Sequence, residues 1–333
     1  MEKIGGFTVK LLTLLLGVLI VVILFNFLDI SYTEMLISVK NIPPPYLIIY
    51  AFFQASFIFL LSHRWKLLVF SAEPDLIYKR GFFFCCISFS NLMNSFMLGP
   101  AASVSTKSLA LKVIHKISIK KGVFIALTEH ALNIFIVGLS ILSSILAYLK
   151  LGPPLLNTVV CTLLPPVAVL AILYKFDFFR EAFFAVIGVV ERIMRHLLPK
   201  IISKFNGKGY LLIVESFFKQ AKFKQSLFFS LLIYYLIVCK AFFLATALNL
   251  DLNFLQFLLF YPFIYLTGAF GPTPGSLGFL EMGWVGILSL HGIDAQTAMT
   301  FALVKRVMDD LLEIILGLLG YIYYNWRIVT PNI

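Results

Sequence analysis

The stretch GPTPGSLGFLE, residues 271–281, interrupts one of the most apolar parts of a very apolar chain. Two prolines and three glycines break the backbone there, and Glu281 follows immediately. In hydrocarbon every N–H and C=O must be satisfied internally, so irregular backbone lies at membrane depth only where it is buried in protein or lines a polar cavity. The stretch therefore predicts a broken, re-entrant helix at a substrate site.

The composition indicates a membrane protein. The 333 residues are 60% hydrophobic and 13% charged, and the mean hydropathy is +0.96, whereas soluble domains are about 25% charged. The net charge of +11 comes from basic residues between apolar runs, which the positive-inside rule and anionic headgroups explain without nucleic acid. The four cysteines lie within apolar runs and lack metal spacing. We therefore expect neither a metal nor a cofactor.

Hydrophobic runs predict the spans. A membrane-spanning helix needs about 20 apolar residues. Two shorter runs, 81–99 and 254–270, both end at a Gly-Pro pair and are interpreted as arms of re-entrant hairpins. The predicted full spans are 11–28, 46–62, 122–149, 155–174, 226–248 and 299–324.

The distribution of Lys and Arg predicts the topology. Segments 63–80 and 175–226 are rich in basic residues and are expected in the cytoplasm. Segments 29–43, 150–154 and 249–253 are poor in them and are expected outside. With both termini in the cytoplasm, the first hairpin then enters from the cytoplasm and the second from the outside. The predicted fold is all-α and polytopic, with about six spans and two oppositely directed hairpins.

Each half of the chain follows the same order: a run to Gly-Pro, a break with small residues, a returning segment and a charged span. Pro100 precedes Glu129 by 29 residues, and Pro272 precedes Lys305 by 33. This order predicts an inverted repeat, which is common in transporters with broken helices. We expect one transmembrane domain, 1–333, divided into a first half 1–149, a connecting part 150–225 and a second half 226–333.

Within the connecting part, residues 178–205 alternate apolar clusters with basic residues. The segment is too interrupted to span the membrane. It predicts an amphipathic helix on the anionic inner leaflet.

The last span carries most of the charges at membrane depth. Arg306, Asp309, Asp310 and Glu313 recur at i, i+3, i+4 and i+7 and so share one helical face, with Lys305 beside Asp309. Each charge costs roughly 2.5–3.5 kcal/mol at the bilayer centre, so this face must contact the bundle or water. It forms either a polar pathway for a headgroup or coupling ion, or ion pairs that lock the bundle. We favour the pathway, since a purely structural lock seldom needs five charges.

The broken stretch offers an anion site. A half-helix that begins near Ser276 or Leu277 would direct free N–H groups toward an anion. Gly275 and Gly278 would let a phosphate approach the backbone. The alternative is that the prolines and glycines form only a tight buried turn.

Glu281 has two possible roles. It could pair with Lys305 or Arg306, or it could take up a proton for coupling. We favour the pairing. Lys240, inside another predicted span, could snorkel or face the cavity.

In the corresponding span of the first half, Glu129 and His130 are adjacent, with Asn133 one turn from Glu129. A lone buried histidine is more often structural than a ligand. No second His or Cys gives metal spacing here, so we rank Glu129 above His130.

Several motifs resemble the transmembrane region of lysylphosphatidylglycerol synthases, a flippase-like family that includes free-standing members. The most specific is the P-x-P-G-x-L-G-x-x-E element at 272–281, with Arg306 downstream. The stretches HRWKLL at 63–68 and HGI at 291–293 also fit, and the likeness spans nearly the whole chain. Where relatives tend to have a Pro-Gly turn followed by acid and arginine, this chain has AASVSTK at 101–107. It also has Glu129-His130 where Glu-Arg is usual.

The resemblance implies a protein that moves or positions lipids. Synthase activity in that family lies in a separate soluble domain, so it is not inferred here. The resemblance places the family's motif positions at Pro274, Gly275, Gly278, Glu281 and Arg306.

We therefore expect a flippase-like lipid transporter of the cell (inner) membrane. Its partner would be an anionic phospholipid or a polyprenyl-phosphate, and it could assemble as a homo-oligomer. The predicted substrate-binding residues are Pro274, Gly275, Ser276, Gly278, Glu281, Lys305 and Arg306. The predicted charge-coupling residues are Asp309, Asp310, Glu313, Glu129 and His130.

Two other functions stay open. The chain has no P-loop, Rossmann fingerprint, nucleophile elbow or HExxH motif, so we expect that it is not an enzyme. A membrane-embedded glycosyl- or phosphoryl-transferase could still use Glu129, Asp309 or Asp310 as a base or metal ligand. A non-transporting scaffold would recruit a partner through the basic segment 175–224.

Overall fold

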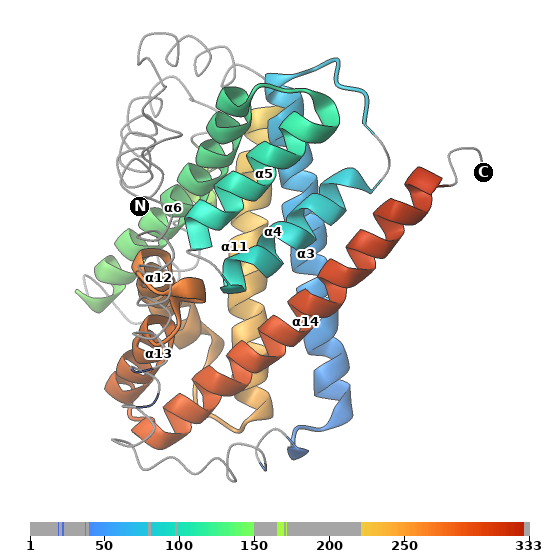
Figure 1. Ribbon diagram of the computed structural model, residues 1–333. Coiled ribbons are helices and arrows are strands. Elements are labelled where there is room, and N and C mark those ends of the chain that lie inside the picture. Colours follow the sequence, from blue (N-terminus) through green and yellow to red (C-terminus); the bar gives the residue numbers. More distant parts are fainter. Residues whose placement is uncertain are drawn as a thin grey trace, which may run out of the picture.

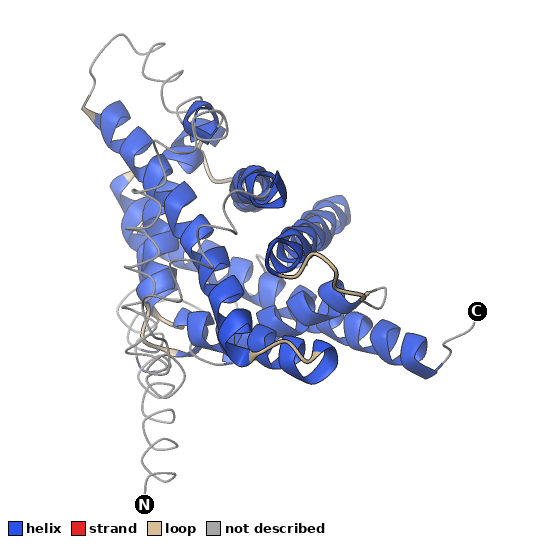
Figure 2. Cartoon of the chain, turned by 90° about the horizontal axis from the view of Figure 1, so that it is seen from above, coloured by secondary structure: helices blue, strands red, loops and turns tan. Residues whose placement is uncertain are grey.

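The computed structural model describes residues 40–78, 81–96, 99–149, 165–169 and 221–329, together with positions 19, 22, 37 and 171. The described residues form helices and loops and contain no strand (Figures 1 and 2). The prediction of an all-α protein is therefore confirmed for this part of the chain. The elements are α3 (Pro44–Ala72), α4 (Phe82–Phe96), α5 (Gly99–His115), α6 (Ile119–Tyr148), α11 (Ala221–Ala247), α12 (Phe254–Phe270), the 3₁₀ turn η1 (Pro274–Ser276), α13 (Phe279–Leu290) and α14 (Ala295–Val329).

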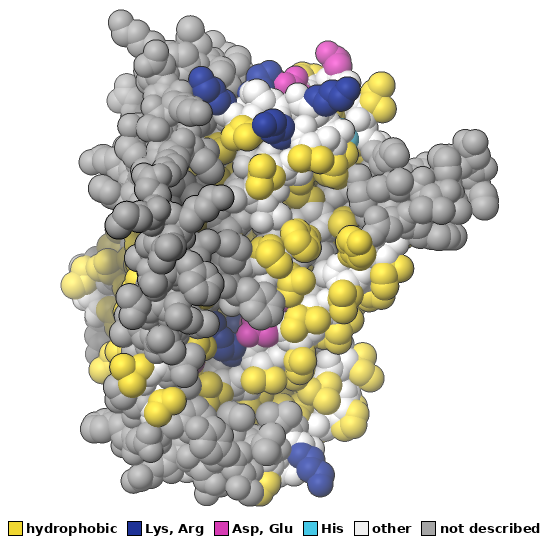
Figure 3. All heavy atoms as spheres, in the orientation of Figure 1, with side chains coloured by type: hydrophobic (Ala, Val, Ile, Leu, Met, Phe, Trp, Pro, Cys, Tyr) yellow, Lys and Arg dark blue, Asp and Glu magenta, His cyan; other side chains and the backbone are white. Residues whose placement is uncertain are grey.

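Three of the described helices are long and apolar enough to cross a membrane: α3, α6 and α11. The shorter α4 and α12 are also apolar. The outer surface of the bundle suits a lipid environment, because large apolar side chains such as Ile48, Phe52 and Phe59 are exposed on it. Figure 3 shows apolar side chains over the middle of one face, with Lys and Arg side chains mainly near one end.

Polar side chains set several helix starts. Asn253 precedes α12, and its side chain accepts a hydrogen bond from the Gln256 amide at 2.9 Å, while Gln256 Oε1 accepts from the Asn253 amide at 2.8 Å. This reciprocal cap satisfies two amides that the helix itself leaves unpaired. Asp294 caps α14 by accepting from the Thr297 amide at 2.8 Å. Hydrogen bonds from the side chain and the amide of Thr297 hold the pKa of Asp294 below its usual value.

The long helices α3 and α11 pack along each other in opposite directions. Arg64 on α3 contacts Ser230 on α11, whereas Gln54, ten residues earlier, contacts Lys240, ten residues later. The residue number falls on one helix as it rises on the other, so the helices are antiparallel. Figure 1 shows this pair at the centre of the bundle, with α14 crossing the bundle diagonally.

Two pairs of shorter helices lie between the long ones. α4 packs on α5, and α12 packs on α13, each pair joined by a short connection. The ends of the two pairs meet, because η1 contacts α4. At this junction a Cβ on Gly275 would lie 2.7 Å from the carbonyl oxygen of Ser95. The two predicted hairpin regions thus touch where their backbones turn.

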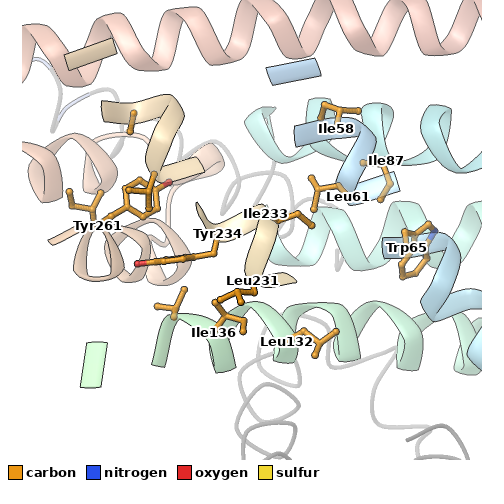
Figure 4. Close-up of a cluster of buried hydrophobic side chains, with 14 of the residues drawn as sticks. Ile58, Leu61, Trp65, Ile87, Leu132, Ile136, Leu231, Ile233, Tyr234 and Tyr261 are labelled. Carbon is orange, nitrogen blue, oxygen red and sulfur yellow. The ribbon is translucent and has the colours of Figure 1, made fainter. Parts of the chain in front are cut away.

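The apolar core joins α3, α4, α6, α11 and α12. Trp65 and Ile58 are fully buried, and Figure 4 shows them with side chains from the other helices. Between helices in lipid, close packing replaces the hydrophobic effect as the main attraction. One such close contact is between α5 and α6, where a Cβ on Gly122 would lie 2.9 Å from the Cα of Ser108. The other labelled core residues are Leu61, Ile87, Leu132, Ile136, Leu231, Ile233, Tyr234 and Tyr261.

Helix α3 extends beyond the predicted span 46–62. It continues to Ala72, into the segment 63–80 that is expected in the cytoplasm, and Arg64 is fully buried within it. Lys107 on α5 is buried as well, at 4% exposed. Both cations are buried because they share a carboxylate, as described below. They therefore carry no information about which side of the membrane a loop lies on.

Several predictions fall outside the described residues. These are most of the span 11–28, most of the span 155–174, the amphipathic segment 178–205, nearly all of the basic segment 175–226 and most of the connecting part 150–225.

Candidate functional site

A cavity of about 410 Å³ lies between the helices, within the range of ligand sites. It is lined by residues from both helix pairs and from all four long helices. Most of the wall is apolar. Its acidic, basic and histidine lining residues are Lys107, Glu129, His130, Lys305, Arg306, Asp309, Asp310 and Glu313.

In the wall of this cavity Glu129 binds two cations. Its Oε1 accepts from Arg64 at 2.8 Å, and its Oε2 accepts from Lys107 at 2.7 Å. Arg64 also donates to Asn133 at 2.6 Å and to Ser230 at 3.0 Å. We call Arg64, Lys107 and Glu129 the Glu129 cluster. It joins α3, α5 and α6 and carries a net charge of about +1 on ordinary protonation states.

A second cluster fixes the broken stretch to α14. The Arg306 guanidinium forms a close ion pair with Glu281 and donates to the Gly275 carbonyl at 2.6 Å. Glu281 also accepts from the Gly278 amide at 2.6 Å. We call Arg306, Glu281 and the Gly275 carbonyl the tip cluster. The favoured pairing of Glu281 with Arg306 is confirmed.

A third cluster surrounds Asp309. Its carboxylate accepts from Lys240 and from Lys305, both at 2.6 Å, and from the Tyr50 hydroxyl at 2.7 Å. Lys240 also donates to Gln54 at 2.5 Å. Lys240 therefore does not snorkel but binds inside the bundle. The Asp309 cluster joins α3, α11 and α14.

Asp310 and Glu313 are bound mainly by neutral groups. The Ser95 hydroxyl lies 3.0 Å from Asp310 Oδ1 and 3.2 Å from Glu313 Oε2. Gln54 donates to Glu313 at 3.4 Å, and the nearest Arg306 nitrogen lies 3.8 Å from Asp310, beyond hydrogen-bond distance. These two carboxylates complete the charged face predicted on the last span, and the bonds of all five ionisable residues confirm that this face meets the bundle.

The predicted helix N-terminus differs from the observed one. α13 begins at Phe279, because Gly278 before it has φ +83°, and η1 contains Gly275 with φ +57°. The Gly278 amide donates to Glu281, so the protein's own carboxylate occupies the position expected for a ligand anion. Gly275, expected to admit a phosphate, instead admits the backbone of Ser95.

In each half of the described chain, one long helix is joined to two other helices by ion pairs. In the first half, Glu129 on α6 contacts α3 through Arg64 and α5 through Lys107. In the second, α14 contacts α11 through the Asp309–Lys240 pair and α13 through the Arg306–Glu281 pair. In the first half the single carboxylate of Glu129 makes both connections. In the second half Asp309 makes one of them and Arg306, of opposite charge, makes the other.

Of the other predicted residues, Pro274 and Ser276 lie in η1, and both are buried. Ser276 lines the cavity, and its hydroxyl donates to the Gly268 carbonyl. His130 lines the cavity next to Glu129. Among the described residues no group of three or more His, Cys, Asp or Glu is placed to hold a metal ion.

Sequence reasoning missed Tyr50, Gln54 and Ser95 as partners of the acidic face. It also missed the roles of Arg64 and Lys107. The sequence held one signal for the two cations. Glu129 lies inside an apolar run and needs a positive partner, and Arg64 and Lys107 lie near the ends of other apolar runs. Neutral hydroxyl and amide partners carry no such signal.

Gly275→Ala is expected to lower the free energy of unfolding by roughly 1–3 kcal/mol. Position 275 has φ +57°, and a Cβ there would lie 2.7 Å from the Ser95 carbonyl. The apparent Tm in detergent measures the effect. Gly286→Ala is the control, because nothing lies within 4 Å of its Cβ position. Equal Tm values for the two variants would contradict a tight contact at the tip.

Comparison with known proteins gives one family. A model of the lysylphosphatidylglycerol synthase transmembrane region matches residues 11–317. The chain matches none of the curated proteins or solved structures with which it was compared.

Proposed function

The chain belongs to the lysylphosphatidylglycerol synthase transmembrane-region family, and on that premise we propose that it binds the phosphate of an anionic lipid headgroup and carries the lipid across the bilayer. Such a lipid is an anionic phospholipid or a polyprenyl-phosphate. The proposed location is the cell (inner) membrane, with both termini in the cytoplasm.

One observation carries this proposal: a mostly apolar cavity wall holds three cations, Arg306 of the tip cluster, Lys305 and Lys107, together with four carboxylates that pair with cations or bind neutral groups. Buried charges at membrane depth are costly and therefore mark functional pathways by default. A guanidinium has five N–H donors. Two N–H groups of Arg306 are engaged by Glu281 and the Gly275 carbonyl, so others are available for a phosphate oxygen.

The proposed architecture has about six spans and two re-entrant hairpins, α4–α5 and α12–α13, which enter from opposite sides. The antiparallel α3 and α11 support an inverted repeat, as does the contact between the hairpin ends. In transporters of this plan the substrate site lies at the repeat interface near the midplane. Residues of both proposed hairpins line the cavity, which supports a site between them.

The tip cluster supplies a mechanism for release and closure. A headgroup phosphate that binds the remaining N–H groups of Arg306 draws the guanidinium toward itself and weakens its bonds to Glu281 and to the Gly275 carbonyl. Glu281 keeps its bond to the Gly278 amide, which limits the cost of losing Arg306. Freed from Arg306, the Gly275 turn can shift against Ser95. Asp309 and Asp310 balance the charge of the cations or couple the step to an ion.

The test is reconstitution of the purified protein into vesicles that contain a fluorescent anionic phospholipid. We expect the protein to speed movement of the label between leaflets at least tenfold over protein-free vesicles. A matched vesicle set with the same lipid and a structurally unrelated membrane protein controls for bilayer defects. No acceleration for either a phospholipid or a polyprenyl-phosphate would reject the proposal.

A transferase is the second candidate, because Asp310 and Glu313 line the cavity bound mainly to neutral groups. Such carboxylates could serve as a base or bind Mg²⁺ together with a donor substrate. The same vesicles distinguish the two functions. A flippase moves lipid without a donor or divalent cation, whereas a transferase changes the mass of the lipid only when both are added.

A further inference from the structure

Ser95 lies near the end of α4 and connects three parts of the bundle. Its carbonyl oxygen lies against Gly275 of η1, where a Cβ would come within 2.7 Å of it. Its hydroxyl lies 3.0 Å from Asp310 and 3.2 Å from Glu313, both on α14. The residue that closes the contact between the ends of the two helix pairs is therefore also the residue that binds these two carboxyl groups.

One hydroxyl cannot satisfy two ionised carboxylates. A serine hydroxyl has a single hydrogen to donate, and an ionised carboxylate only accepts. If Asp310 and Glu313 were both ionised, one of the two contacts to Ser95 would bring two acceptor oxygens together without a hydrogen between them. A single proton on either carboxyl completes both bonds, because that carboxyl donates to the Ser95 oxygen while Ser95 donates to the other carboxylate.

The other neighbours of the two carboxyl groups do not supply this compensation. Asp309, beside them on α14, already binds two lysines. Asp310 has no cation within hydrogen-bond distance among the described residues, since the nearest Arg306 nitrogen is 3.8 Å away. The further partner of Glu313 is the neutral amide of Gln54, at 3.4 Å. Both carboxyl groups line the cavity, and the Asp310 side chain is 41% exposed, so the pair can exchange a proton with water.

The local charge also favours one proton. In this region the described carboxyl groups of α13 and α14 exceed the cations of α11 and α14 by one when all are ionised, and a net charge at membrane depth is costly. The positive charge of the Glu129 cluster is paired with Glu129 and forms no described ion pair with this region. The groups counted are Glu281, Asp309, Asp310 and Glu313 against Lys240, Lys305 and Arg306. The other titratable groups around the pair are Tyr50 on α3, which binds Asp309, and Tyr261 on α12, Lys107 on α5 and Glu129 and His130 on α6, which line the same cavity.

We propose that Asp310 and Glu313 share one proton through Ser95, and that this proton holds the ends of the two helix pairs together. Loss of the proton leaves both carboxylates charged and removes one of the two Ser95 bonds. Asp310 can then draw Arg306 away from the Gly275 carbonyl, so a rise in pH opens the contact. The inference deepens the proposed transport function, because it names the coupling ion as a proton.

Infrared difference spectroscopy of the purified protein tests the proton. Solvent-exposed carboxyl groups lose their protons at about pH 4, so a protonated-carboxyl band that is present at about pH 5 and lost by about pH 9 reports a shared or buried proton. We expect this band in the wild type and its loss in Glu313→Gln and in Asp310→Asn, because either variant leaves one carboxylate that Ser95 can satisfy alone. Glu73→Gln is the control and should keep the band, since Glu73 is 33% exposed and pairs with Lys121.

Pairs of spin labels test the closure. Phe89 on α4 and Met282 on α13 are 44% and 48% exposed, and both can be replaced by cysteine in a chain whose own cysteines are alanines. We expect the distance between the labels to lengthen as the pH rises through the range in which the band is lost. Glu313→Gln should keep the short distance at every pH. Its amide can accept from Gln54 and donate to Ser95, as a protonated Glu313 does.

Each result decides one part of the inference. The absence of a pH-dependent band in the wild type, or its survival in both Glu313→Gln and Asp310→Asn, would overturn the shared proton. A band that disappears while the distance stays constant would overturn its hold on the helix ends. A distance that responds to replacement of Na⁺ by choline at constant pH, and not to pH, would assign the pair to a metal cation and overturn the proton. None of these measurements uses lipid movement, so a failure here is distinguishable from a failure of the transport function.

Discussion

Replacing Glu129 with glutamine is expected to produce the largest loss of stability of any single change in the described residues. Arg64 is fully buried and Lys107 is 4% exposed, and both bind this one carboxylate. Removing one partner of a buried ion pair typically costs 3–5 kcal/mol, because the other charge stays buried without compensation. Here two cations are affected, and proteins are stable by only about 5–15 kcal/mol. We expect little monodisperse protein and a strongly lowered apparent Tm.

Two variants control this result. Glu73→Gln makes the same change in the Glu73–Lys121 pair, whose side chains are 33% and 39% exposed, and should cost about 0–1 kcal/mol. Adding Lys107→Met to Glu129→Gln should recover part of the loss, because Arg64 keeps Asn133 and Ser230 as partners. If Glu129→Gln unfolds at the same temperature as Glu73→Gln, the Glu129 cluster does not stabilise the bundle.

The charged face of α14 could be predicted from sequence because helical periodicity alone places Arg306, Asp309, Asp310 and Glu313 on one side. Their high cost in lipid then requires that side to face the protein. The pairing of Glu281 with Arg306 also followed, since the two charges are opposite and each needs compensation. These inferences need only the spacing of the residues and the cost of burying a charge, and both can be read from the sequence.

The Glu129 cluster could not be predicted in the same way. Arg64 and Lys107 lie near the ends of apolar runs, where positive residues normally mark the cytoplasmic side. Composition cannot distinguish a cation in a loop from one that turns inward to a carboxylate on another helix. Only the packing of α3, α5 and α6 brings the three charges together.

The broken stretch was recognised from its prolines and glycines, but its details depend on tertiary contacts. The glycines were expected to admit a ligand. Gly275 instead makes room for the Ser95 carbonyl, which belongs to the other half of the chain. A contact between residues 180 positions apart leaves no trace in local sequence.

Arg306→Ala is expected to abolish lipid movement in reconstituted vesicles, with a rate equal to that of protein-free vesicles. The side chain lines the cavity and holds both Glu281 and the Gly275 carbonyl. Arg306→Lys should restore only a minor part of the rate. A lysine keeps the charge, but its compact ammonium cannot reproduce the planar fork that contacts a carboxylate and a carbonyl together.

Loss of activity in Arg306→Ala alone would not show whether Arg306 binds the phosphate or only holds the bundle together. The variant also leaves the carboxylate of Glu281, which is 1% exposed, without its cation. The double variant Glu281→Gln/Arg306→Ala separates these two roles. It removes both charges, and a glutamine at position 281 can still accept the hydrogen bond that the Gly278 amide now donates to Glu281. If Arg306 only neutralises Glu281, the double variant should recover both Tm and lipid movement. If Arg306 binds the phosphate, Tm should recover while lipid movement stays at the protein-free rate. Recovery of both would reject Arg306 as the headgroup ligand and leave Lys107 and Lys305 as the remaining cations of the cavity wall.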